Sequence, residues 1–231
     1  MLKPGDILSY LDMCRIEGTS LQRGMNFRLR PTHSVVLMSQ RAGAPYADRV
    51  EEEGRTLVYE GHDVPRSSDA PVPKELDQPA MTPGGKPTQN GLFSAAAHRQ
   101  RRGTCPPEKV RVYEKIKTGI WVYNGVFDLV DAWTESSQGR QVFKFRLELS
   151  ENEVASDAGA SIDLSHTRMI PTQVKLEVWK RDGGKCVLCD STDNLHFDHD
   201  IPFSKGGSSL VAANIQLMCA RHNLAKHDNI Q

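Results

Sequence analysis

The first two thirds of the chain consists of short apolar runs separated by turn residues. The runs are rich in Val, Leu, Tyr and Phe and are bounded by Gly, Pro or Asn, which is typical of strands joined by loops. In the last run, apolar residues from Phe143 to Leu149 alternate with charged ones, as a half-buried strand requires. The strands predicted in this way are 34–38, 55–59, 109–116, 120–123 and 142–149. They indicate one strand-dominated domain over residues 1–150.

Two further segments differ from these strands in amino-acid composition. Residues 64–107 are rich in Pro and contain Gly84-Gly85, so we expect a long loop with a helix only near 92–98. Residues 151–170 are mostly small and polar and predict a linker. A helix is then expected from Pro171 to Arg181. The elements together predict an α+β protein whose second domain spans 171–231.

Composition narrows the possible classes of protein. The chain has 231 residues, of which 25% are charged, and it contains no apolar run long enough for a membrane span. The start lacks the apolar core of a signal peptide, so we expect a soluble, cytoplasmic protein without a membrane partner. Lys plus Arg and Asp plus Glu are each 29, so a nucleic-acid partner must bind local basic patches.

The cysteines indicate a metal site. Five cysteines is an odd number, which argues against a disulfide scaffold and towards metal ligands plus spare thiols at Cys14 and Cys105. Two pairs have the close spacing that lets each supply two corners of a zinc tetrahedron. The predicted zinc ligands are Cys186, Cys189, Cys219 and His222. On these ligands alone, a purely structural zinc ribbon is the favoured interpretation.

The residues around the two pairs add an acid, an imidazole and amides. A strand over 195–199 is predicted to end in Asp198 and His199, and Asn214 and Asn223 follow. The residues that characterise this segment are 181–186, Asp198-His199, 204–208, 214–219, His222-Asn223 and Lys226. The segment from 174 to 228 resembles an HNH endonuclease domain, which implies a ββα-metal fold. One departure is the fourth zinc ligand, which in that family is more often Cys than His222.

The resemblance also implies roles for individual residues. His199 would be the general base that takes a proton from the attacking water, which suits an imidazole with a pKa near neutral. Asp198 and Asn223 would hold one divalent cation, Mg²⁺ or Mn²⁺, against the scissile phosphate. Asn214 would either fix the loop or orient His199. His196 shares a strand face with Asp198 and is either an alternative metal ligand or a plain strand residue.

The N-terminal domain carries a second set of motifs. They occur at 34–37, 43–50, 59–63, 88–91, 110–112 and 123–133. In this order they resemble the SRA, or YDG, domain, although Asn124 stands where the family signature has Asp. The resemblance implies a curved, barrel-like sheet that flips a modified cytosine out of the duplex and holds it in a pocket.

Such a pocket needs aromatic faces and a polar group for the edge of the base. Tyr46 and Tyr59 match the stacking positions of the family. Asp48, or a neighbouring residue, would accept from the exocyclic amine of cytosine. For either Tyr in isolation, ordinary packing is the simpler interpretation.

Basic residues outside the pocket are candidates for contacts with the DNA backbone. They are Arg99, Arg101 and Arg102 in the first domain, and Lys205 and Lys226 in the second. The alternative is that these charges form only a solvated surface.

Together, the two resemblances imply an SRA–HNH modification-dependent restriction endonuclease, type IV-like, associated with DNA in a prokaryotic cytoplasm. Its partner would be double-stranded DNA containing 5-methylcytosine or a related modified cytosine. One nuclease site per chain suggests that both strands are cut either by a homodimer or by repeated nicking. Two alternatives are an HNH nicking nuclease that ignores modification and a non-catalytic methylcytosine reader.

Overall fold

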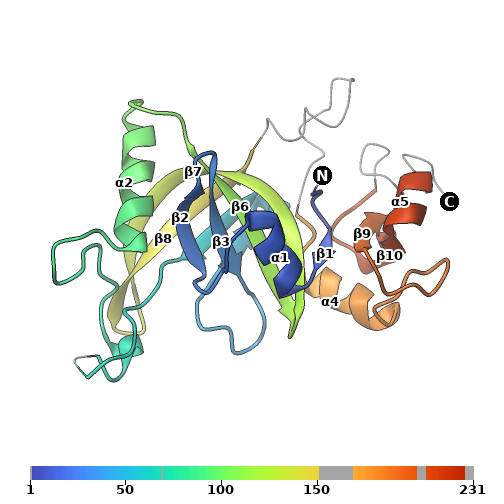
Figure 1. Cartoon of the computed structure of the whole chain (residues 1–231), viewed down its shortest axis with the longest axis horizontal. Helices are drawn as coiled ribbons and strands as arrows, with labels where there is room; N and C mark the ends of the chain where they lie inside the picture. The colour runs from blue at the N-terminus through green and yellow to red at the C-terminus, as the bar shows by residue number, and fades with distance from the viewer. Residues whose placement is uncertain (1, 69, 151–168, 202–206, 227–231) are drawn as a thin grey trace.

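The structure is a computed structural model that describes residues 2–68, 70–150, 169–201 and 207–226 (Figure 1). Its strands are β1 (Ile7–Leu8), β2 (Met25–Arg30), β3 (His33–Met38), β4 (Arg49–Glu51), β5 (Thr56–Glu60), β6 (Glu108–Lys117), β7 (Ile120–Ser137), β8 (Arg140–Leu149), β9 (Leu195–His199) and β10 (Ile215–Cys219). Its α-helices are α1 (Tyr10–Glu17), α2 (Gln89–Arg101), α4 (Thr172–Arg181) and α5 (Ala220–Lys226). The predicted α+β class is confirmed.

The larger sheet contains every strand predicted in the first 150 residues. Its strands follow the order β2-β3-β6-β7-β8-β5-β4, and β1 pairs with β7 beside this path. β3 and β6 are parallel, whereas the other neighbouring pairs are antiparallel. The main core lies between this sheet and α2, which buries Phe93, Ala96 and Ala97 at the spacing of an amphipathic helix. β7 continues to Ser137, well beyond the predicted strand end at residue 123.

The interpretation of the first 63 residues as strands and loops is wrong for one segment. Residues Tyr10–Glu17 form helix α1, which begins with a capping box. The Ser9 hydroxyl accepts from the Asp12 N–H at 3.1 Å, and the Asp12 carboxylate accepts from the Ser9 N–H at 3.2 Å. The helix ends at Gly18, whose φ of 63° is the left-handed conformation of a C-terminal glycine. These cap residues are the sequence signal that strand patterning overlooked.

The C-terminal part consists of the β9–β10 hairpin with helices α4 and α5. The hairpin is antiparallel, with Phe197 opposite Leu217 and His199 opposite Ile215. The predicted helix from 171 to 181 is α4, and the predicted strand over 195–199 is β9. In Figure 1 this part lies at the opposite end of the large sheet from α2.

The two parts share one apolar core. Val174 and Val178 of α4 pack with Phe197 of the hairpin and with Ile116 and Val122 of the large sheet. Burying a side chain of this size contributes about 1.5–3 kcal/mol each. The C-terminal part is therefore docked on the sheet by apolar burial.

A buried polar cluster lies at the same junction. Lys175 Nζ of α4 donates to Glu114 Oε2 and to Asn124 Oδ1, both at 2.6 Å. Asn124 Nδ2 also donates to Glu114 Oε2 at 3.0 Å, and the Thr172 hydroxyl contacts Glu114 Oε1. All four residues are buried. The Asn124 amide therefore both donates to Glu114 and accepts from Lys175.

Most of the predicted linker lies outside the described residues, and the division into 1–150, 151–170 and 171–231 stays a prediction. At its end, Met169 and Ile170 are buried, and the Met169 N–H donates to the Gly54 carbonyl at 3.0 Å. None of the helices described here has the length and apolar character needed to cross a membrane.

Candidate functional site

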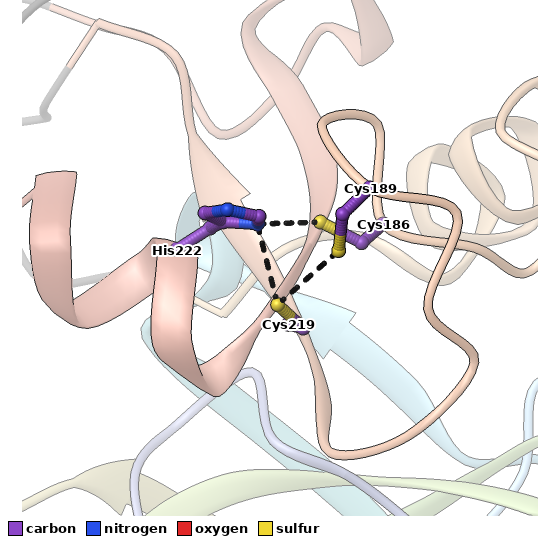
Figure 2. Close-up of side chains that lie close together, drawn as sticks. All are labelled: Cys186, Cys189, Cys219 and His222. Carbon is purple, nitrogen blue, oxygen red and sulfur yellow. Dashed lines mark hydrogen bonds between the residues drawn. The ribbon is translucent and has the colours of Figure 1, made fainter.

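The four predicted metal ligands converge in the C-terminal part (Figure 2). Their ligand atoms all lie within 4.8 Å of one another. His222 Nδ1 is 3.4 Å from the sulfurs of Cys186 and Cys219, and the sulfurs of Cys189 and Cys219 are 3.8 Å apart. A tetrahedral zinc with Zn–S bonds of about 2.3 Å places its sulfur ligands roughly 3.8 Å apart. The cluster therefore has the donor set and size of a structural metal site such as zinc.

The local backbone favours thiolate at this cluster. Burial by itself raises the pKa of Cys186, but backbone N–H groups of Cys219 and Leu188 and the His222 side chain outweigh it and lower the pKa to about 6. A thiolate is the form of cysteine that binds a metal ion. The loop after α4, the end of β10 and the start of α5 supply these ligands together.

Three of the predicted catalytic residues line one cavity of about 250 Å³. They are Asp198 and His199 at the end of β9 and Asn223 of α5. His199 Nε2 lies 2.8 Å from the Ser209 hydroxyl. Burial lowers the pKa of His199 below its ordinary value, although Asp198 opposes this shift. The imidazole is thus neutral at pH 7, which is the form that can accept a proton.

Asn214, the fourth predicted catalytic residue, holds the loop that follows His199. Its side-chain oxygen accepts from the Ile201 N–H at 2.8 Å, and its amide donates to the carbonyls of Ile201 and Ser208. Gly207 fits beneath this contact because a Cβ there would lie 1.9 Å from the Ile201 oxygen. Of the two roles predicted for Asn214, these contacts are of the kind that fixes the loop. Any part that it has in orienting His199 stays a prediction.

Lys226, predicted to contact the DNA backbone, is buried beside the nuclease residues in this structure, and its contact with a phosphate stays a prediction. The side chain is 3% exposed, and Nζ donates to Asp198 Oδ2 at 2.6 Å and to the His199 carbonyl. Lys226 therefore neutralises the carboxylate predicted to bind the divalent cation. Lys205 lies outside the described residues.

In the N-terminal part, Tyr46 belongs to a partly buried aromatic stack. Its ring lies parallel to His62, with ring centroids 4.5 Å apart, and the Lys74 ammonium lies 4.0 Å from the Tyr46 centroid. Burial lowers the pKa of His62 to about 4, so this imidazole is neutral. Asn90, at the start of α2, exchanges two hydrogen bonds with the His62 backbone at 2.8 and 2.9 Å. The stack is thereby attached to the helix that covers the main core.

Tyr59, the second predicted stacking residue, has no open face in this structure. Its ring is 1% exposed and belongs to the main core. Its hydroxyl donates to the Gly24 carbonyl at 3.0 Å and lies 2.8 Å from His62 Nε2. Tyr59 therefore supports the stack from below, and its predicted contact with a base stays a prediction.

Both carboxylate oxygens of Asp48 accept hydrogen bonds from the backbone. One oxygen accepts from the Ser39 N–H at 3.1 Å, and the other accepts from the Glu60 N–H at 3.0 Å. Burial raises the pKa of Asp48 to about 7. The residue joins the ends of β3 and β5, and its role in reading a base edge stays a prediction.

Sequence analysis missed a charged network under the stack. Lys144 of β8 donates to Glu60 Oε2 at 2.9 Å, and Arg140 donates to Asp63 Oδ1 at 2.6 Å. Strand alternation predicted that the charged side of β8 faces solvent, but the Pro-rich segment covers it and both Lys144 and Arg140 are buried. The opposite charges of Glu60 and Lys144 become a signal only when the register that pairs them is known.

The predicted DNA-contacting arginines lie together at the end of α2. A surface hollow of about 550 Å³ is lined by Ala95, His98, Arg99, Arg101 and Arg102. Arg101 also pairs with Asp131 at 2.8 Å. α2 has 13 residues at a rise of about 1.5 Å each, so it spans roughly 20 Å. This basic hollow lies at its C-terminal end, whereas Asn90, which holds His62 of the stack, lies near its N-terminal end.

Comparison with known proteins identifies the C-terminal part. Residues 186–229 match the family model of the HNH endonuclease. No curated protein matches the chain.

Solved structures similar to this chain include SRA domains. A crystal structure of SUVH5 SRA with hemimethylated CG DNA is 23% identical, with a TM-score of 0.44, over 65% of this chain and 90% of that chain. SUVH5 SRA bound to fully hydroxymethylated CG DNA is 20% identical, with a TM-score of 0.45, over the same shares. Arabidopsis thaliana SUVH6 in complex with SAM is 21% identical, with a TM-score of 0.42, over 65% of this chain and 26% of that chain.

The family match covers both metal-ligand pairs and three residues that line the cavity, Asp198, His199 and Asn223. The predicted nuclease domain is thus confirmed, and the chain carries an HNH endonuclease domain at residues 186–229.

Proposed function

We propose that this protein is an endonuclease that recognises a modified cytosine in double-stranded DNA and hydrolyses phosphodiester bonds nearby. The observation that carries the proposal is the HNH domain, in which Asp198, His199 and Asn223 line one cavity beside the Cys₃His cluster. The modified base is proposed from the order of SRA-like motifs in the first domain. The aromatic stack at Tyr46 supports it.

In the nuclease site, His199 acts as the general base. The neutral imidazole takes a proton from the attacking water through one ring nitrogen. Asn214 keeps the loop after His199 in place through three hydrogen bonds. Lys226 holds Asp198 and the His199 carbonyl, so that the end of β9 keeps its shape when DNA binds.

Two metals are proposed, with different partners. Zinc would be held by Cys186, Cys189, Cys219 and His222, and it would keep the domain folded. A divalent cation, Mg²⁺ or Mn²⁺, would be held by Asp198 and Asn223, and when bound it would neutralise charge on the scissile phosphate. The fit is supported by a carboxylate and an amide that share one cavity. Lys226 must share Asp198 with this cation.

In the reader domain, Tyr46 and His62 would receive the flipped base. Their rings are 4.5 Å apart, so a base can enter only if the two rings separate. Lys74 would leave the Tyr46 ring at the same time, because it occupies space beside that ring. The basic hollow at Arg99, Arg101 and Arg102 would contact the phosphate backbone of the same duplex.

The biological role that fits this pair of activities is type IV-like restriction of modified foreign DNA in a prokaryotic cytoplasm. A two-fold dimer would suit a palindromic site that is modified on both strands, because each chain brings one nuclease site.

The experiment is a comparison of two plasmids that differ only in cytosine methylation. Each is incubated with the full chain and Mg²⁺ or Mn²⁺, and His199→Ala is the control for contaminating nuclease. Cutting of the methylated plasmid alone supports the proposal, provided that His199→Ala is inactive. Cutting of neither plasmid contradicts the nuclease assignment and favours a non-catalytic methylcytosine reader.

Equal cutting of both plasmids would favour an HNH nicking nuclease that ignores modification. One observation speaks for this second function. Tyr59 is buried, and both oxygens of Asp48 already accept hydrogen bonds, so the predicted base pocket is closed.

A further inference from the structure

The nuclease cavity is also lined by the N-terminal segment of the other domain. Residues 3–6 reach the cavity on one side, and His196 of β9 lines it together with Asp198, His199 and Asn223. The N-terminal segment pairs with the hairpin through an isolated antiparallel bridge between Asp6 and His196, and the Phe197 N–H donates to the Gly5 carbonyl at 3.0 Å. A residue of the first domain is thereby placed beside the nuclease site.

That residue is Asp6, which holds one nitrogen of His196. Asp6 Oδ1 is hydrogen-bonded to His196 Nδ1, and Asp6 Oδ2 accepts from the Lys3 N–H at 2.8 Å. The backbone of Asp6 is fixed as well, since its carbonyl accepts from the Tyr123 N–H at 2.9 Å. Gly5 allows this approach, because its φ is +97° and a Cβ there would lie 2.8 Å from the Phe197 oxygen.

The other nitrogen of His196 is buried without a hydrogen bond among the described residues. His196 Nε2 shares this property with Gln216 Nε2. Residues that are two apart in a strand project from the same face, so His196 and Asp198 lie on one face of β9. Gln216 of β10 is directly opposite Asp198. Two unsatisfied polar groups thus lie next to the proposed ligand Asp198. Buried polar atoms ordinarily have a partner, so both groups have hydrogen-bonding or ligating capacity that the described side chains do not use.

We propose that His196 is a third protein ligand of the catalytic divalent cation, with Asp6 fixing the imidazole from the reader domain. This inference rests on the divalent site of the proposed function. A metal-ligating His ordinarily gives its second ring N–H to a carboxylate, which sets the tautomer and the ring orientation. The Asp6–His196 pair has that arrangement, which leaves the lone pair of Nε2 for a metal.

The chemical consequence is a preference among metals. Imidazole suits Mn²⁺, Co²⁺ or Ni²⁺ better than Mg²⁺, which prefers oxygen ligands and keeps its waters. The site is therefore expected to bind Mn²⁺ more tightly than Mg²⁺. Because Asp6 belongs to the first domain, a displacement of the N-terminal segment would weaken the metal site.

The experiment measures Mn²⁺ binding directly, by electron paramagnetic resonance on the full chain with its Cys₃His site loaded with zinc. His196→Ala and Asp6→Asn are compared with the unaltered protein. His33→Gln is the matched control, because His33 Nε2 pairs with Glu17 at 2.9 Å in another imidazole–carboxylate pair that does not line the cavity. Asp198→Ala tests the divalent site itself.

We expect bound Mn²⁺ to show a ¹⁴N coupling that His196→Ala removes and His33→Gln keeps. The dissociation constant for Mn²⁺ should rise about 10–100-fold in Asp6→Asn, the usual effect of losing a carboxylate behind a ligating His. The preference for Mn²⁺ over Mg²⁺ should shrink in His196→Ala.

Two results would overturn the inference. One leaves the proposed divalent site intact, and the other removes that site as well. Mn²⁺ binding that depends on Asp198 but shows no ¹⁴N coupling, with unchanged affinity in His196→Ala, would exclude His196 as a ligand and leave the proposed nuclease standing. Absence of any Asp198-dependent Mn²⁺ binding would remove the divalent site and this inference together.

Discussion

Replacing Lys175 with Met should strongly destabilise the protein, because it leaves a carboxylate buried without its cation. Glu114 is 0% exposed and Lys175 is 1% exposed, and their charged atoms are 2.6 Å apart. Removing one partner of such a pair costs about 3–5 kcal/mol. For a chain of this size, 1 kcal/mol shifts Tm by about 2–4 °C, so a fall of roughly 6–20 °C is expected.

The loss should depend on pH in a defined direction. Burial raises the pKa of Glu114, but the charge of Lys175 and hydrogen bonds from Lys175, Thr172 and Asn124 outweigh it and hold the pKa below its ordinary value. The wild-type ion pair therefore contributes stability above the unfolded pKa, about 4.3, and loses it as the pH falls further. Without Lys175, Glu114 must be protonated to stay buried. The deficit of Lys175→Met should thus be largest at pH 8 and smaller near pH 5.

Urea unfolding of the full chain at pH 5 and pH 8 measures this effect. The matched control is Arg101→Met, which breaks the exposed pair with Asp131 at 2.8 Å and should cost less than about 1 kcal/mol. The double variant Glu114→Gln with Lys175→Met should recover much of the lost stability, because it leaves no buried charge. A loss in Lys175→Met no larger than the control, or one that does not change with pH, would refute the reasoning.

Three further predictions follow from the same structure. Asn124→Asp should destabilise by about 1–3 kcal/mol because the side chain no longer donates to Glu114 and two carboxylates share Lys175; thermal unfolding measures it, and an unchanged Tm would contradict it. Burial lowers the pKa of His62 to about 4, so stability should fall as the pH drops from about 6.5 towards 4, by up to about 3 kcal/mol. His62→Gln should flatten that slope in urea titrations, and an equal slope in both proteins would count against it. Arg102→Ala should reduce the dependence of DNA affinity on log salt by about 1, seen in binding titrations at several salt concentrations, and an unchanged slope would exclude Arg102 from phosphate contact.

Several elements were predictable because their signals are local. The Cys₃His ligands were found from their spacing in the chain, and the structure brings them together. β9 and α4 were placed correctly because alternation and a proline at the first turn are read over a few residues. α1 was missed although its caps were equally local, because short apolar runs around it were interpreted as strands.

The reader pocket was less predictable, because its residues meet through strand pairing. Tyr59 was expected to face a base, but the register of β5 against β8 places it in the main core. Lys144 and Glu60 lie directly behind the stack only because the same register makes them neighbours. Lys226 was expected at the surface, and α5 instead turns it towards Asp198.

The sequence by itself determined the metal cluster, the nuclease motif and most strands, because spacing and alternation act within one element. Tertiary structure alone decided which side chains meet when their elements are far apart in the sequence. Asp6 meets His196, and Glu114 meets Lys175, only after the C-terminal hairpin and α4 have packed on the large sheet. The physical reason is that apolar burial at the junction brings these groups together out of water. Each buried charge then needs a partner, and local sequence patterns do not predict which residue that partner is.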